Sequence, residues 1–185
     1  MKKTTKYLTI LFDFLKNVPI IGAKSRYCSG REAQDMASNS QYSAFDIADY
    51  FLFKAEEEGQ ELLSNLKLQK LVYYAQGLYL VEKELPLFED KIIAWQYGPV
   101  VSNLYHKFKH YGAGGIPADR NFNQSSIDKD TKEFLDGIFD FFGQYSAIRL
   151  MQLAHADQCY IDAGINNEIT HEAMREDLKA WIKDG

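Results

Sequence analysis

Few residues of this chain have the type and spacing that catalysis or metal binding needs. His106 and His110 lie four residues apart, the spacing that places two metal ligands on one helix face. The residues between them are Lys-Phe-Lys, so the glutamate that acts as general base in metalloproteases of this pattern is missing. A zinc site also needs further ligands, for which His155 with Asp157 is the candidate pair. A basic outer helix face explains the two histidines without a metal, so we predict no metal site.

The two cysteines form no recognisable redox or metal motif. Cys28 and Cys159 are far apart, no C-x-x-C pair is present, and two cysteines are too few for a disulfide framework. Cys159 with a histidine would suggest a thiol nucleophile, but a lone cysteine more often serves as a small buried apolar residue. We therefore predict reduced thiols in a cytoplasmic protein, no cofactor and no catalytic residue, so that the chain is not an enzyme.

Composition limits the class of partner. The 185 residues include 21 basic and 26 acidic side chains, a net charge of -5, and the arginines are scattered along the chain. A nucleic-acid-binding protein normally needs a clustered basic face, so nucleic acid is not the expected partner. With 46% apolar and 14% aromatic residues, the chain can bury one core and still present an aromatic surface.

The first 41 residues differ from the rest of the chain. Lysines at positions 2, 3 and 6 precede an apolar run that Asp13 interrupts, and no small-residue cleavage site follows. The run is also shorter than the ~20 residues that cross a bilayer. Leu8, Leu11 and Leu15 fall on one face at helical spacing. The sequence therefore predicts an amphipathic helix within 1–21 that docks on the domain or on a partner, a polar linker over 22–41, a domain over 42–185, and no membrane contact.

Helical periodicity dominates residues 42–185, interrupted by turn residues. The predicted helices cover about 43–58, 64–85, 99–111 and 128–142, with two more beginning at Ser146 and after Thr170, and a short strand is predicted over 91–96. Gly77 inside the second helix costs about 1 kcal/mol against alanine, so a close helix crossing is the expected compensation. The predicted fold class is mainly α: a single compact helical domain with one or two short β-strands and an N-terminal helical appendage.

Aromatic residues gather around a Trp-x-Tyr-Gly-Pro turn. Aromatic side chains mostly pack in cores, but Trp and Tyr are also the residues used most often as interface anchors. If Gly98 at this turn adopts a positive φ, a β-branched residue in its place would be strained. The candidate partner-binding residues are Trp95, Tyr97 and Tyr105, with Leu8, Leu11 and Leu15 from the N-terminal segment.

Several segments, in order, carry a resemblance to a known family. They are LKLQKLVYYAQG at 66–77, AWQYGPV at 94–100, the aromatic run at 105–112, and LAH at 153–155. This order resembles the SocA-like antitoxin family, also called the Panacea domain, which includes phage-associated GepA-type proteins. The resemblance extends over about 42–181, and Cys159-Tyr160 stands where the family often has Pro-Trp.

The resemblance implies an antitoxin that neutralises a cognate protein toxin by direct protein–protein binding. In some members it also implies delivery of the bound toxin to a protease. It reaches no catalytic residue and does not identify the toxin. Two alternatives stay open: a phage or host-effector interaction protein with the same fold, and a small metal-dependent hydrolase that uses His106, His110 or His155.

Overall fold

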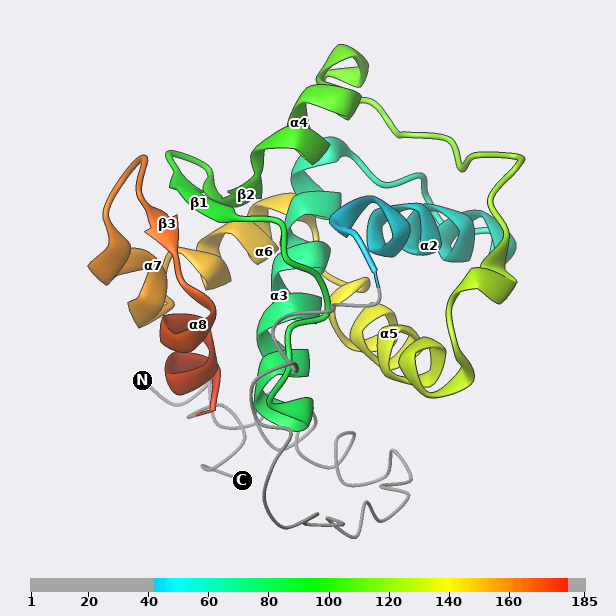
Figure 1. Ribbon diagram of the computed structural model, residues 1–185. Helices are drawn as coiled ribbons and strands as arrows, with labels where there is room; N and C mark the ends of the chain where they lie inside the picture. Colours follow the sequence, from blue (N-terminus) through cyan, green and yellow to red (C-terminus); the bar gives the residue numbers. More distant parts are fainter. Residues whose placement is uncertain (1–41, 180–185) are drawn as a thin grey trace, which may run out of the picture.

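The computed structural model describes residues 42–179, and one central helix organises them. This helix, α3 (Asn65–Lys83), packs against α2 (Ala44–Glu57), α5 (Lys129–Phe142), α6 (Ala147–Ala154) and α8 (His171–Leu178), as Figure 1 shows. The predicted N-terminal helix and linker, and the end of the last predicted helix, lie outside the described residues. The mainly α fold class is confirmed.

Helix α3 is buried on nearly every side. Ser64 caps its first turn by accepting a hydrogen bond from the Lys67 N–H, and the helix ends at Glu84, whose φ is +59°. Every residue over 68–78 is buried. A helix that is enclosed in this way has no solvent face for its polar side chains, which must therefore find partners inside the protein.

The flanking helices α2 and α5 begin at capping residues, and α5 meets α3 through aromatic rings. Ser43 forms a capping box with Asp46 at the start of α2, and Asp128 caps α5. Tyr74 of α3 stacks on Phe142 of α5 at 4.3 Å between ring centroids, with an angle of 6° between the rings. These stacked contacts fix the two helices side by side in the core.

A small antiparallel sheet lies on one side of α3. Strand β1 (Ile92–Trp95) pairs with β2 (Gly98–Val101) on one edge and with β3 (Glu168–Ile169) on the other. The sequence-based start of a helix at Pro99 is wrong, because residues 98–101 continue the hairpin and α4 (Ser102–Phe108) begins after them. The β-branched Val100 and Val101 favour the strand, and an edge strand tolerates the proline.

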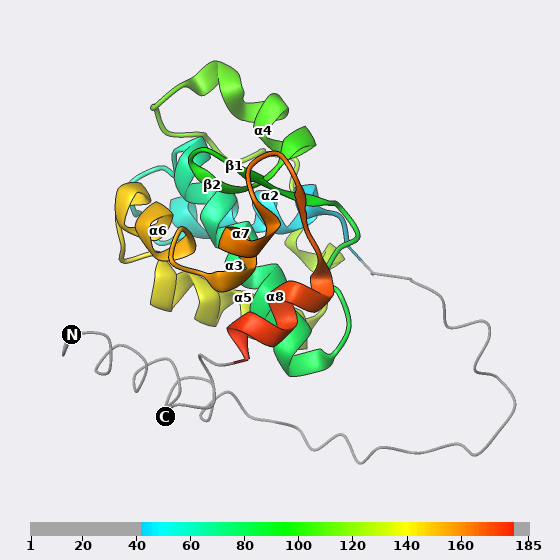
Figure 2. The same ribbon diagram turned by 90° about the vertical axis from the view of Figure 1, so that its left-hand side faces the viewer.

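A short helix that the sequence did not predict completes the fold. This helix, α7 (Gln158–Ala163), lies between α6 and β3, and Figure 2 shows it with α8 on the same side of the molecule as the sheet. Its six residues are too few to give a periodic signal. Within residues 42–179, no helix is both long and apolar enough to cross a membrane.

The expected close crossing at Gly77 is confirmed. A Cβ placed there would overlap Leu178 Cδ1 of α8, and Met174 Cε would lie 3.4 Å away. We predict that Gly77→Leu lowers the free energy of unfolding by about 1–3 kcal/mol, because overpacking outweighs the gain in helix propensity. Urea denaturation measures the change.

Leu178→Ala provides the internal control for this prediction. The double variant Gly77→Leu/Leu178→Ala should be more stable than the sum of the two single effects by about 0.5 kcal/mol or more, since the second change makes room for the first. Strict additivity would contradict the crossing.

Candidate functional site

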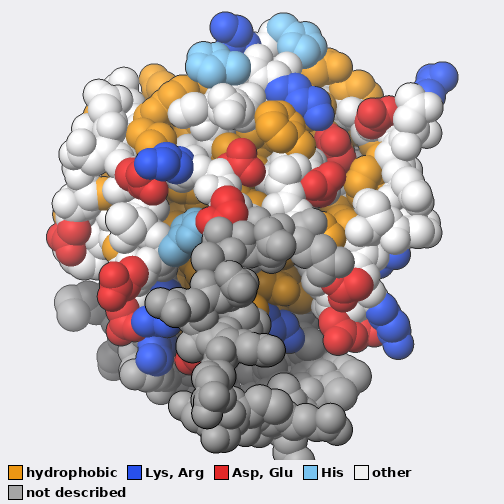
Figure 3. Space-filling model, in the orientation of Figure 1, with side chains coloured by type: hydrophobic (Ala, Val, Ile, Leu, Met, Phe, Trp, Pro, Cys, Tyr) orange, Lys and Arg blue, Asp and Glu red, His pale blue; other side chains and the backbone are white. Residues whose placement is uncertain are grey.

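Three aromatic rings form a surface cluster where the hairpin meets α4. Trp95 of β1 lies edge-on to Tyr105 at 5.1 Å between ring centroids, and His106 lies 6.3 Å from Trp95 and 5.5 Å from Tyr105. Trp95 and Tyr105 are half-buried, whereas His106 is exposed. Figure 3 shows histidine and lysine side chains beside apolar ones over α4. The structure therefore brings together two of the aromatic residues that the sequence singled out.

Tyr97 lies near this cluster in sequence, two residues after Trp95, at the tip of the hairpin. It is 62% exposed, the most open of the described aromatic side chains named as candidates. Gly98 follows it with a φ of +95°, so the condition under which a β-branched replacement is strained is met. Trp95, Tyr97, Tyr105 and His106 are hereafter called the aromatic surface. Of the other residues near the turn, Tyr111 lies apart from this surface and contacts Phe108 and His110.

Buried polar side chains of α3 hold the aromatic surface from beneath. Lys70 is fully buried, and its Nζ donates a hydrogen bond to the Pro99 carbonyl at 2.8 Å. The Gln69 side-chain oxygen accepts from the Val101 N–H at 2.9 Å. Asn65 Nδ2 donates to the Tyr105 carbonyl at 3.2 Å. Because all three act on backbone atoms, they fix the path of the chain through β2 and α4.

The C-terminal half supports the other edge of the hairpin. Tyr160 of α7 donates its hydroxyl hydrogen bond to the Trp95 carbonyl at 2.9 Å, and its ring stacks on His155 at 4.9 Å. The Ala94 N–H donates to the Asn167 carbonyl at 2.9 Å. Tyr160, which lies 65 positions after Trp95 in the sequence, thus helps to fix the backbone of Trp95.

Two basic side chains meet under the turn. Burial is the cause that lowers the pKa of Lys70 to about 7. Burial, and then the charge of Lys70, lower the pKa of His155. His155 Nε2 is itself buried and has no hydrogen-bond partner among residues 42–179. Both groups are therefore biased toward their neutral forms near neutral pH.

Asp157 and Cys159 lie in the interior and have no nucleophilic character. Asp157 accepts a hydrogen bond from the Tyr73 hydroxyl at 3.0 Å, and burial raises the pKa of Asp157 to about 8. Burial likewise raises the pKa of the Cys159 thiol to about 12. A thiol held protonated in this way is a poor nucleophile. Cys159 therefore fits the role of a small buried apolar residue.

His106 and His110, the two candidate metal ligands four residues apart, contact different aromatic rings. His106 belongs to the aromatic surface, whereas the His110 ring lies 4.1 Å from the Tyr111 ring between centroids, tilted by 40°. Across residues 42–179, no group of three His, Cys, Asp or Glu side chains is placed to hold a metal ion. What the arrangement offers chemically is a rigid aromatic face suited to recognition.

Comparison with known proteins places this chain in a family that is named after an antitoxin. The profile of the family described as antitoxin SocA-like, Panacea domain, matches residues 68–160. Antitoxin SocA of Caulobacter vibrioides (strain NA1000 / CB15N) is 32% identical over 105 residues, which are 51% of this chain and 55% of that protein. The chain thus spans about half the length of the curated relative. No solved structure matches.

Replacing Gly98 tests the turn geometry. We predict that Gly98→Val destabilises the protein by about 2 kcal/mol or more, because valine is strained at positive φ. The added Cβ would also lie 2.8 Å from Lys70 Cε. Gly59→Val is the matched control, since Gly59 has a φ of +62° but no neighbouring atom within 4 Å. A melting temperature lowered no more by Gly98→Val than by Gly59→Val would contradict the contact with Lys70.

The buried ionisable groups predict opposite slopes of stability with pH. Asp157 has a pKa of about 8 in the fold against an ordinary 3.8, so it contributes stability that is lost as pH rises from about 4 to 8. Lys70 has a pKa of about 7 against 10.5, so the unfolded chain binds the extra proton and stability rises from pH 7 to about 10. Each slope is at most about 1.4 kcal/mol per pH unit.

Urea denaturation of two variants separates these effects. Asp157→Asn should remove part of the decline below pH 7, and Lys70→Met part of the rise above pH 8, each relative to the wild-type curve. Other titrating groups cancel in that difference. A wild-type-minus-Lys70→Met difference that is flat between pH 8 and 10 would contradict the assignment of a lowered pKa.

Proposed function

Because this chain belongs to the antitoxin SocA-like, Panacea domain family, we propose that it is a cytoplasmic antitoxin that neutralises a protein toxin by binding it directly. The observation that carries this proposal is the aromatic surface, which presents Trp95, Tyr97 and Tyr105 on a hydrogen-bonded frame. Tryptophan and tyrosine dominate the binding energy of many protein interfaces. The toxin would bury these side chains against a complementary apolar pocket.

Rigidity of the frame supports binding over catalysis. A preorganised surface loses less conformational entropy on association, so more of the contact energy appears as affinity. The hairpin is tied to α3 by Lys70 and Gln69 and to α7 by Tyr160. The protonated Cys159 thiol and the separate positions of His106 and His110 also support a stoichiometric mode of action.

Charge supports a basic partner. The chain has a net charge of -5. Complementary charge accelerates association and suppresses wrong partners. A toxin that is basic overall fits the net charge of this protein, and the part of the toxin that faces the lysine and histidine side chains of α4 would be neutral or acidic.

Co-expression with the neighbouring gene tests the function. We expect the neighbour alone to arrest growth, this chain to restore growth, and the two proteins to co-purify. Restored growth with no complex would contradict direct binding and favour an enzymatic antitoxin. A harmless neighbour would favour the phage or host-effector alternative.

Truncating Tyr97 tests the location of the interface. We predict that Tyr97→Ala weakens toxin binding by ~2 kcal/mol or more, about thirtyfold in Kd, without lowering the melting temperature, because the ring is exposed. Leu85→Ala is the matched control, since Leu85 is 63% exposed and Tyr97 is 62% exposed. Calorimetric titration gives both affinities. Equal effects of the two variants would place the interface elsewhere.

A further inference from the structure

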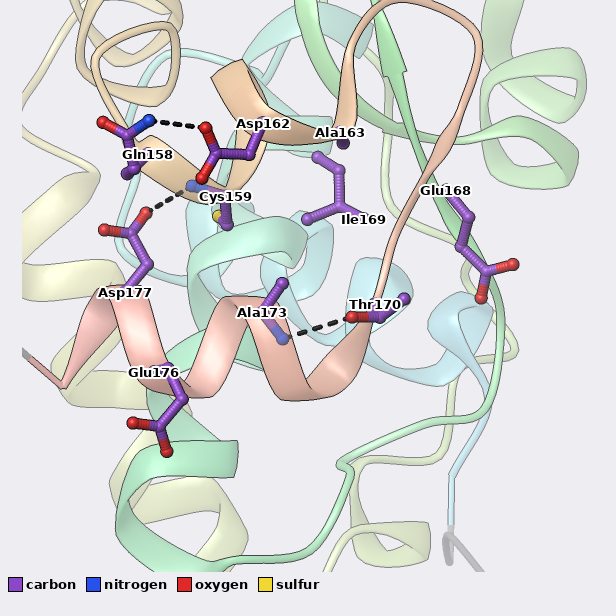
Figure 4. Close-up of a pocket in the computed structure, with 10 residues that line it drawn as sticks. All are labelled: Gln158, Cys159, Asp162, Ala163, Glu168, Ile169, Thr170, Ala173, Glu176 and Asp177. Atoms are coloured by element: carbon purple, nitrogen blue, oxygen red, sulfur yellow. Dashed lines mark hydrogen bonds between the residues drawn. The ribbon is translucent and has the colours of Figure 1, made fainter.

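A groove between α7, β3 and α8 lies outside the aromatic surface. Its volume is about 470 Å³, and its floor includes the buried side chains of Cys159 and Ile169, with Ala163 and Ala173 beside them. Figure 4 shows Asp162, Glu168, Glu176 and Asp177 surrounding this apolar floor. The ten lining residues include these four carboxylates and no basic residue. The groove therefore suits an amphipathic segment that carries positive charge.

The carboxylates keep most of their capacity to bind a cation. Asp162 accepts only from the neutral Gln158 amide, at 2.6 Å, within the described residues, and Asp177 accepts the Cys159 N–H at 2.8 Å. Glu168 pairs with Lys91, whose side chain is 72% exposed, and Glu176 pairs with the Arg175 guanidinium at 3.4 Å. Exposed ion pairs of this kind contribute little and exchange partners readily.

Charge is divided unevenly along the chain. Residues 1–41 contain seven basic and three acidic side chains, a net charge of +4, whereas residues 42–185 contain 14 basic and 23 acidic side chains, a net charge of -9. The two values sum to the -5 of the whole chain. The N-terminal segment thus complements the folded part in sign.

We propose that residues 2–18 of this same chain occupy the groove. The stripe of Leu8, Leu11 and Leu15 matches the apolar floor, and Lys3 and Lys16, which flank the stripe on its two sides at helical spacing, match the acidic rim. The 24 Cα-to-Cα steps from Val18 to Tyr42 span up to about 80 Å when extended, more than the breadth of a domain of this size. These apolar and electrostatic contacts would form between two parts of one chain, whether or not the protein binds a toxin.

Zero-length crosslinking of the full chain tests the occupant. A water-soluble carbodiimide joins a lysine amine to a carboxylate only when the two are in contact. In the monomeric fraction we expect Lys2, Lys3, Lys6 or Lys16 to be joined to Asp162, Glu168, Glu176 or Asp177 in mass spectra. Linkages from these lysines only to carboxylates outside the groove, only between molecules, or to none, would overturn the proposal.

Charge reversal supplies the control. Asp162→Lys/Glu176→Lys should lower the yield of linkages from the N-terminal lysines to Glu168 and Asp177 about tenfold, because two favourable pairs become repulsive. Glu57→Lys/Glu61→Lys makes the same change of net charge on exposed residues away from the groove and should leave the yield unchanged. An equal fall in both variants would mean that only net charge matters and would overturn the assignment to the groove. Circular dichroism confirms that both variants are folded.

Discussion

The enclosure of α3 is the constraint on which the rest of the structure depends. Over 68–78 this helix has no exposed residue, so each polar side chain within it must bond to protein groups. An unsatisfied buried polar group costs about 1–3 kcal/mol. Gln76 meets the demand fully: its side-chain oxygen accepts from the N–H groups of Leu87 and Phe88, and its nitrogen donates to the Phe88 carbonyl at 2.9 Å.

The same requirement connects the core to the aromatic surface. The Lys70 amine donates to the backbone of β2 and the Gln69 side-chain oxygen accepts from it, and in doing so they fix the hairpin that carries Trp95 and Tyr97. The positive φ of Gly98 lets the turn lie directly over the Lys70 side chain. The same hydrogen bonds therefore contribute to core stability and to surface geometry. Loss of the polar contacts of α3 would also loosen the face proposed to bind the toxin.

Sequence patterns predicted the features that depend on neighbours in the chain. Ser43, Ser64, Asp128, Ser146 and Thr170 each cap a helix as local chemistry requires. Gly77 signalled a helix crossing because glycine inside a helix needs a compensating contact. The strand at β1 was likewise visible from its β-branched residues.

Features that depend on distant partners could not be found in this way. Pro99 reads locally as the start of a helix, and only its pairing with β1 places it in a strand. Gln69, Lys70 and Asp157 gain their importance from backbone or hydroxyl groups 29 to 84 residues away. The only signal available was that polar residues interrupt a helix apolar on every face, which implies buried partners without naming them.

Hydrogen exchange of the protein with and without its toxin tests the central claim most directly. The claim is that the face formed by the hairpin and α4 binds the partner on a frame set by α3. Added protection on complex formation should concentrate in residues 95–106, with little change over 68–78, which are already buried. Added protection confined to α2 and α5, with none over 95–106, would contradict the account.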